Sequence, residues 1–240
     1  MGVTMGRILK KPSYIVNDAD CRHAVARRRA ACKARSTVTP PNDLAHLTVR
    51  DPAAALRTLR QQWRGHAQWW IFGYASLIWR PEFDAAEHRL ALVHGWHRAL
   101  RMRSRVNRGT PQQPGLVFAL LPGGACRGVV YRMRPEQAEA ELDRLWEREM
   151  PTGVYDARLL PCRTAQGPVV ALAFTLSRRS EACLPRLPDD EVCHILRHSH
   201  GRYGTTMAYL AETAAALRVR GVRDREIERL MALARREGLA

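Results

Sequence analysis

Hydrophobic positions along the chain change from a helical spacing to short strand-like runs near residue 69. Between residues 51 and 64, Ala55, Leu56, Leu59 and Trp63 recur at the spacing of one helix face, which predicts an amphipathic helix. Short apolar runs rich in β-branched and aromatic residues follow, and Gly or Pro residues separate several of them. These runs predict strands over residues 69–72, 89–94, 115–121, 128–133 and 169–175.

Helical patterns reappear between and after these runs. The spacing predicts helices over residues 135–150, 205–218 and 224–237. Strands and helices do not alternate regularly, as they would in a doubly wound parallel sheet. The order therefore predicts an α+β fold, in which helices flank a mixed, partly closed β-barrel.

Positive charge is concentrated near the start of the chain. The formal net charge is +16, and residues 1–40 contain nine Lys or Arg and two Asp, which makes +7. Residues 1–50 show no sustained hydrophobic period and are predicted to be a flexible basic extension, and residues 51–240 a single domain. An arm that binds RNA or directs targeting is the alternative to a dispensable extension.

Composition excludes several other classes of protein. No apolar run approaches the roughly 20 residues that span a bilayer, so the sequence predicts a soluble protein without membrane partners. The six cysteines form no C-x-x-C pair and are interpreted as reduced thiols. Since the first residues lack a secretory signal pattern, the expected location is the cytoplasm.

One carboxylate of the predicted helix over residues 135–150 faces the apolar side. Leu142, Leu145 and Trp146 lie on one stripe of this helix, and Glu149 follows Leu145 by four residues. Burial raises the pKa of a carboxyl group, which suits a general base. The alternative is that Glu149 lies at a frayed helix end and faces water.

A turn rich in small residues follows the first predicted strand. The chain reads F-G-Y-A-S-L-I-W over residues 72–79, and Gly73, Ala75 and Ser76 would let backbone N–H groups approach a ligand in an exposed turn. Such donors stabilise a developing oxyanion. The alternative is a turn that only connects two elements.

Several motifs in the same order resemble the ChaC-like, glutathione-specific γ-glutamylcyclotransferases. Residues 72–79 resemble the family's substrate-binding signature F-G-Y-G-S-L-I-W. G-W-H-R at 95–98 with N-R-G-T-P at 107–111, and the R-E pair at 148–149, are similar to later family motifs. The glycine-rich stretch 123–132 and the segment 201–210 continue the likeness, which covers about residues 69–235.

The resemblance implies a reaction and a set of residues. The α-amine of the γ-glutamyl group of glutathione would attack its own γ-carbonyl, forming 5-oxoproline and releasing Cys-Gly, without metal or nucleotide cofactor. Glu149 would accept the proton and Arg108 would pair with a substrate carboxylate. The γ-glutamyl group would bind to the turn formed by Ile71, Phe72, Gly73, Tyr74, Ala75 and Ser76.

The likeness has one departure and leaves the exact substrate open. Ala75 stands where the family usually has Gly, so its methyl group is expected to narrow the pocket or alter the turn. The same catalytic parts would serve other γ-glutamyl amines or γ-glutamyl amino acids.

Three other interpretations were weighed. His194 and His198 are four residues apart, as helix-borne metal ligands are, but no H-E-x-x-H pattern is present and no metal site is predicted. The arginine-rich segment 98–108 would suit an RNA-binding or regulatory protein, although nucleic acid is not the expected partner. Ser76 does not lie in a G-x-S-x-G elbow, and an intramolecular amine makes an enzyme nucleophile unnecessary.

Overall fold

A closed five-stranded β-barrel forms the centre of the protein. The structure, a computed structural model, describes residues 51–240. The strand order around the barrel is β1-β3-β2-β4-β5, with antiparallel neighbours except where β1 pairs in parallel with β5 and closes it. The α+β class is thus confirmed, and the barrel is fully closed. The strands are β1 (Trp70–Gly73), β2 (Ala85–Ser104), β3 (Gly115–Met133), β4 (Asp156–Thr164) and β5 (Gly167–Thr175).

The long hairpin of β2 and β3 makes most of the barrel wall. The two strands pair from Ala85↔Met133 to Ser104↔Gly115. The prediction of separate strands over 115–121 and 128–133 is wrong, because Gly123 and Gly124 adopt positive φ and keep the strand continuous. Strand β4, which lies between β2 and β5, was not predicted.

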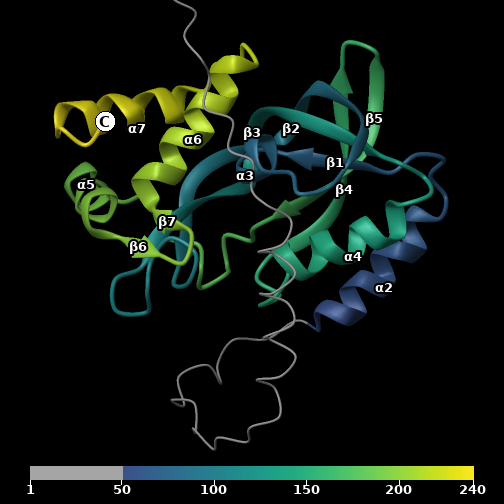
Figure 1. Cartoon of the computed structure of the whole chain (residues 1–240), viewed down its shortest axis with the longest axis horizontal. Helices are drawn as coiled ribbons and strands as arrows, with labels where there is room; N and C mark the ends of the chain where they lie inside the picture. The colour runs from purple at the N-terminus through teal and green to yellow at the C-terminus, as the bar shows by residue number, and fades with distance from the viewer. Residues whose placement is uncertain (1–50) are drawn as a thin grey trace, which may run out of the picture. The chain divides into compact units, whose positions relative to one another are not determined.

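Helices flank the barrel in two groups (Figure 1). On one side lie α2 (Pro52–Trp63) and α4 (Ala138–Glu149), whose apolar faces pack with β1 and β5. On the other side lie α5 (Asp189–His198), α6 (Thr206–Val219) and α7 (Arg225–Arg236). A single turn, α3 (Ser76–Trp79), follows β1, and β6 (His200–Gly201) pairs with β7 (Gly204–Thr205) before α6.

Each sequence pattern of helical spacing corresponds to a helix, whose bounds differ from the predicted ones by at most three residues. The predicted helix over 135–150 becomes α4, and those over 205–218 and 224–237 become α6 and α7. No helix within residues 51–240 is long and apolar enough to cross a membrane. The predicted basic extension, residues 1–50, lies outside the described residues.

Candidate active site

The site begins where β1 ends and the chain turns into α3. Gly73 is closely packed: a Cβ atom there would lie 3.1 Å from Leu77 Cβ and 3.2 Å from Tyr131 Cε2, so these neighbours would have to shift. Tyr74 and Ala75 follow and are only 7% and 6% exposed. The turn is therefore buried, whereas the sequence pattern predicted an exposed one.

Arg98 of β2 holds this turn in place through a hydrogen bond to its backbone. Its side chain is fully buried, and its Nε donates to the carbonyl oxygen of Tyr74 at 2.5 Å. The two Nη atoms contact Asp224 Oδ2, at the start of α7, and the carbonyl oxygen of Arg127, each at 2.5 Å. One guanidinium thus joins the turn, the β3 strand and helix α7, which holds the turn in one position.

A small cavity opens against the turn. Segments far apart in the sequence meet here, because the closed barrel brings the turn, β3, β5 and the last residue of α4 together with α6. The residues that line it are Tyr74, Ala75, Ser76, Leu77, Phe118, Glu149, Tyr155, Phe174 and Tyr209. Its walls are mainly aromatic, and Glu149 is the only carboxylate among them.

Glu149 is largely removed from water. It is the last residue of α4, and its side chain is 16% exposed. Burial raises the pKa of its carboxyl group, and Glu82 raises it further, whereas the neighbouring Arg148 lowers it. The Arg148 Nε atom lies 3.0 Å from Glu149 Oε1. The predicted inward direction of Glu149 is found in the structure, in place of a solvent-facing helix end.

Three tyrosines surround this carboxylate. Burial raises the pKa of Tyr74, Tyr155 and Tyr209, and the negative charge of Glu149 raises each of them further. All three therefore keep their hydroxyl protons at neutral pH. Tyr74 donates to the carbonyl oxygen of Phe174 at 3.0 Å, and the Tyr209 hydroxyl accepts from the Phe118 N–H at 3.2 Å.

The residues predicted for substrate binding do not all face the cavity. Tyr74, Ala75 and Ser76 line it. Ile71 and Phe72 are fully buried in the two large core clusters, so their side chains hold the strand in place. The predicted turn thus divides into a strand that supports the site and a turn that lines it.

Arg108 lies behind the cavity wall. Its guanidinium stacks against the Tyr209 ring at 5.1 Å from the ring centroid. Nη1 donates to the carbonyl oxygen of Tyr203 at 2.6 Å, and Nη2 lies 3.6 Å from Glu212 Oε2. Burial lowers the pKa of Arg108, while Glu212 raises it. The Glu212 contact is long, and the Glu212 side chain is half-exposed.

The histidines of α5, and Arg101 and Arg103 of β2, do not line this cavity. The rings of His194 and His198 are 4.7 Å apart between centroids. Within residues 51–240 no three His, Cys, Asp or Glu side chains are grouped so that they could hold a metal ion. The segment after β5 partly covers β2, since Arg101 Nε donates to the Leu184 carbonyl oxygen at 2.7 Å.

Sequence reasoning missed several cavity residues. Tyr155 follows α4 in a loop without a recognisable pattern. Tyr209 lies in a segment that was noted only for its likeness to the family, and its place in the wall depends on how α6 packs. Arg148 was noted as the first residue of the R-E pair, but its contacts with both Ser76 and Glu149 were not predicted.

The sequence as a whole was compared with known families. A sequence model of the ChaC-like protein family matches residues 69–237, which include the turn, Glu149 and all three tyrosines. The chain belongs to the ChaC-like family.

Individual relatives of this ChaC-like chain carry consistent names. It is 35% identical over 156 residues to the glutathione-specific γ-glutamylcyclotransferase of Escherichia coli, covering 65% of this chain and 68% of the relative. Identity to the human glutathione-specific γ-glutamylcyclotransferase 1 is 31% over 157 residues, which covers 63% of this chain and 71% of the human protein.

A solved structure shares the fold. The yeast γ-glutamylcyclotransferase specific to glutathione superposes with a TM-score of 0.64 at 22% identity, covering 70% of this chain and 96% of the yeast chain. The closed barrel of this ChaC-like protein is thus a γ-glutamylcyclotransferase fold.

Proposed function

We propose that this protein is a γ-glutamylcyclotransferase that converts glutathione to 5-oxoproline and Cys-Gly. Membership of the ChaC-like family and the names of the E. coli and human relatives support the reaction. The observation that carries the proposal is the position of Glu149, a carboxylate with a raised pKa in a cavity bounded by the turn 74–77. Such a group suits proton transfer near neutral pH.

The chemistry follows from the substrate's own atoms. The α-ammonium group of the γ-glutamyl moiety first loses one proton to solvent, and the lone pair of the neutral amine then attacks the γ-carbonyl carbon. As the C–N bond of the five-membered ring forms, the nitrogen becomes positively charged and Glu149 takes a second proton from it. When the bond to Cys-Gly breaks, the protonated Glu149 gives a proton to the departing amine. Atoms and charges balance without a covalent enzyme intermediate.

The turn supplies the remaining groups in this proposal. The first backbone N–H group of α3 that bonds to a carbonyl oxygen within the turn is that of Ile78, which donates to the Ala75 carbonyl oxygen at 2.8 Å. The N–H groups of Ser76 and Leu77 precede it, at the position where a helix start leaves donors available. We assign these N–H groups, together with the neutral hydroxyls of Tyr155 and Tyr209, to the oxyanion that develops during ring closure.

Arg108 has an outer role in the proposal. A substrate carboxylate would bind it by replacing Glu212 at Nη2, while the backbone carbonyls of Tyr203 and Thr205 keep hold of Nη1. A cytoplasmic location belongs to the same proposal. Cys126, Cys162, Cys183 and Cys193 are free thiols, which fits a reducing compartment.

The test is to offer glutathione and γ-glutamyl-alanine separately to the purified protein and to measure 5-oxoproline. We expect rapid release from glutathione and little from γ-glutamyl-alanine. The reverse preference would show that glutathione is not the preferred substrate, whereas the proposed reaction would stand. No 5-oxoproline from either compound, by a folded protein, would contradict the proposed function.

A further inference from the structure

A single arginine connects the proposed proton acceptor with the loop that follows α3. Arg148 Nε lies 3.0 Å from Glu149 Oε1, and Arg148 Nη2 donates to Ser76 Oγ at 3.3 Å. On the other side, Arg148 Nη1 donates to the carbonyl oxygen of Arg80 at 2.7 Å and to Glu82 Oε2 at 3.0 Å. Its positive charge is therefore shared between two carboxylates, Glu149 and Glu82.

Glu82 is held in an unusual backbone conformation. Its φ is 59°, and it is the only non-glycine residue with positive φ among residues 51–240. A residue with a Cβ atom adopts this region at a cost in free energy, so the surroundings must hold it there. The Glu82 carboxylate bonds to Arg80 Nε and to Arg148. This conformation thus coincides with the contact to Arg148.

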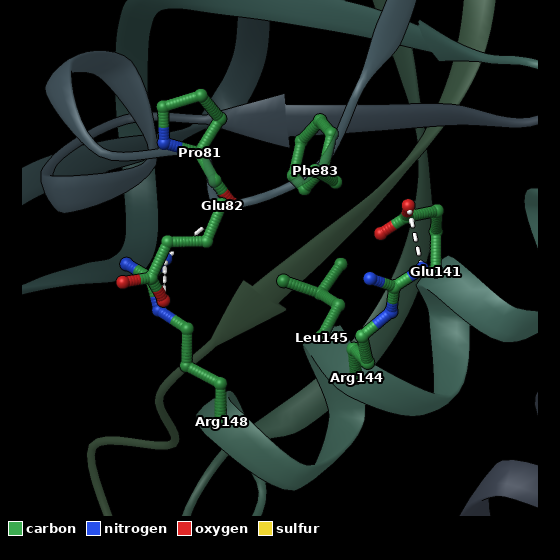
Figure 2. Close-up of a pocket in the computed structure, with 7 residues that line it drawn as sticks. All are labelled: Pro81, Glu82, Phe83, Glu141, Arg144, Leu145 and Arg148. Atoms are coloured by element: carbon green, nitrogen blue, oxygen red, sulfur yellow. Dashed lines mark hydrogen bonds and ion pairs between the residues drawn. The ribbon is translucent and has the colours of Figure 1, made fainter. Parts of the chain in front are cut away.

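The Glu82–Arg148 contact forms one side of a second cavity (Figure 2). This cavity has a volume of about 160 Å³ and lies between the loop 81–83 and the outer face of α4. Figure 2 shows the Glu82 and Arg148 side chains pointing toward one another, joined by a dashed line. Arg148 thus lies between this cavity and the one that Glu149 lines.

We propose that Arg148 and Glu82 are positioning residues for Glu149: Arg148 holds the carboxylate beside the turn, and Glu82 competes with Glu149 for the charge of Arg148. This inference rests on the proposed role of Glu149. A lone arginine beside Glu149 would favour the ionised carboxylate too strongly for a good proton acceptor. A second carboxylate on the same guanidinium offsets that effect, so the base keeps its raised pKa.

Five charged or titratable groups face Glu149 from the elements packed around it. They are Arg148 of α4, Glu82 of the loop after α3, Tyr74 of the turn, Tyr155 of the loop after α4 and Tyr209 of α6. The three tyrosines stay neutral through the range in which a carboxyl group titrates. Among residues 51–240, Arg148 and Glu82 are therefore the groups whose charge shifts the pKa of Glu149.

The experiment measures the titration of the Glu149 carboxyl directly, by NMR of protein carrying carbon-13 glutamate. The signal is assigned from its loss in Glu149→Gln. Glu82→Gln removes a charge and keeps a hydrogen-bond acceptor, so the pKa of Glu149 should fall. Arg148→Gln removes the opposite charge, so the pKa should rise. Asp84→Asn is the matched control, because Asp84 is exposed in the same loop and pairs with Arg134. It should leave the titration unchanged.

The acid limb of kcat/KM for glutathione should move with the carboxyl titration, downward in pH for Glu82→Gln and upward for Arg148→Gln. Ionisation of free glutathione affects all variants equally and cancels in the comparison. Shifts in the same direction, or none beyond the Asp84→Asn control, would overturn the proposal. If Arg148→Gln does not fold, Glu82→Gln alone decides. A protein that makes no 5-oxoproline would overturn the proposed function, yet the NMR titration would still test this inference.

Discussion

Two arginines contact the turn 74–76, Arg98 at its first residue and Arg148 at its last, and they differ in what surrounds them. The Arg98 side chain is fully buried in the barrel, and two of its three partners are backbone carbonyl oxygens. The Arg148 side chain is 22% exposed and contacts the proposed base, a hydroxyl and a second carboxylate. Arg98 thus fixes the geometry of the turn, whereas Arg148 adjusts the charge beside it.

The largest effect in this comparison is expected at Arg98. Arg98→Met would leave the Asp224 carboxylate without its ion-pair partner and would deprive two buried carbonyl oxygens of their donor. Removing one partner of a buried ion pair costs about 3–5 kcal/mol of folding free energy. Urea unfolding measures this change.

Two further variants sharpen the result. Arg105→Met changes an exposed arginine just after β2 and should alter stability by no more than about 0.5 kcal/mol. Arg148→Met should fall between them, because solvent reaches that site. If Arg98→Met unfolds at the same urea concentration as Arg105→Met, the claim that Arg98 supports the fold more than Arg148 does is contradicted.

A smaller effect concerns the stability cost of the buried carboxylate itself. The ordinary pKa of a glutamate carboxyl is 4.5, and burial raises the pKa of Glu149 in the folded state. At pH values between the pKa of the unfolded chain and the higher pKa of the folded protein, the Glu149 carboxyl has lost its proton in the unfolded chain and keeps it in the folded protein. The free energy of unfolding therefore falls as pH rises through this window.

Glu149→Gln should therefore be more stable than the parent protein at neutral pH, by about 0.5–2 kcal/mol. This gain in stability should vanish below pH 4.5, the ordinary pKa of a glutamate carboxyl. Thermal unfolding at several pH values measures the difference. The exposed neighbour Glu147, changed to Gln, is the matched control and should show no such pH dependence. A loss of stability at neutral pH in Glu149→Gln would contradict the assigned burial cost.

The smallest effect is expected at Ala75, which lies in the turn between the two arginines. Its φ is −143°, so the backbone there does not require glycine. Ala75→Gly would remove a methyl group from the cavity wall and is expected to raise kcat/KM for glutathione less than tenfold. Extra freedom in the unfolded chain should lower stability by about 0.5–1 kcal/mol. A larger gain in rate would show that the methyl group obstructs the substrate.

Local patterns predicted the parts of the site that lie on one element. Glu149 was predicted because helical periodicity alone places it beside Leu142 and Leu145 on the buried side of α4. The strand and turn that carry Gly73 were likewise predicted from adjacent residues. The family likeness then added the reaction.

The parts that were missed depend on contacts between distant segments. Tyr155 and Tyr209 meet Glu149 only after the barrel closes and α6 packs against it, and no local pattern encodes that closure. Glu82 contacts Arg148 from a positive-φ conformation that the sequence around it does not require. The strand break expected at Gly123 and Gly124 was wrong for the opposite reason, since the pairing with β2 continues across it.

The most direct test of the account is the rate of 5-oxoproline release from glutathione by Glu149→Gln, compared with Glu147→Gln. Gln has nearly the size of Glu but cannot accept the proton, so kcat should fall about 10²–10⁴-fold while the fold is retained. Glu147→Gln, two residues away and therefore on the opposite face of the same helix, should keep the parent rate. Release by Glu149→Gln at the parent rate would contradict the assignment of Glu149 as the proton acceptor.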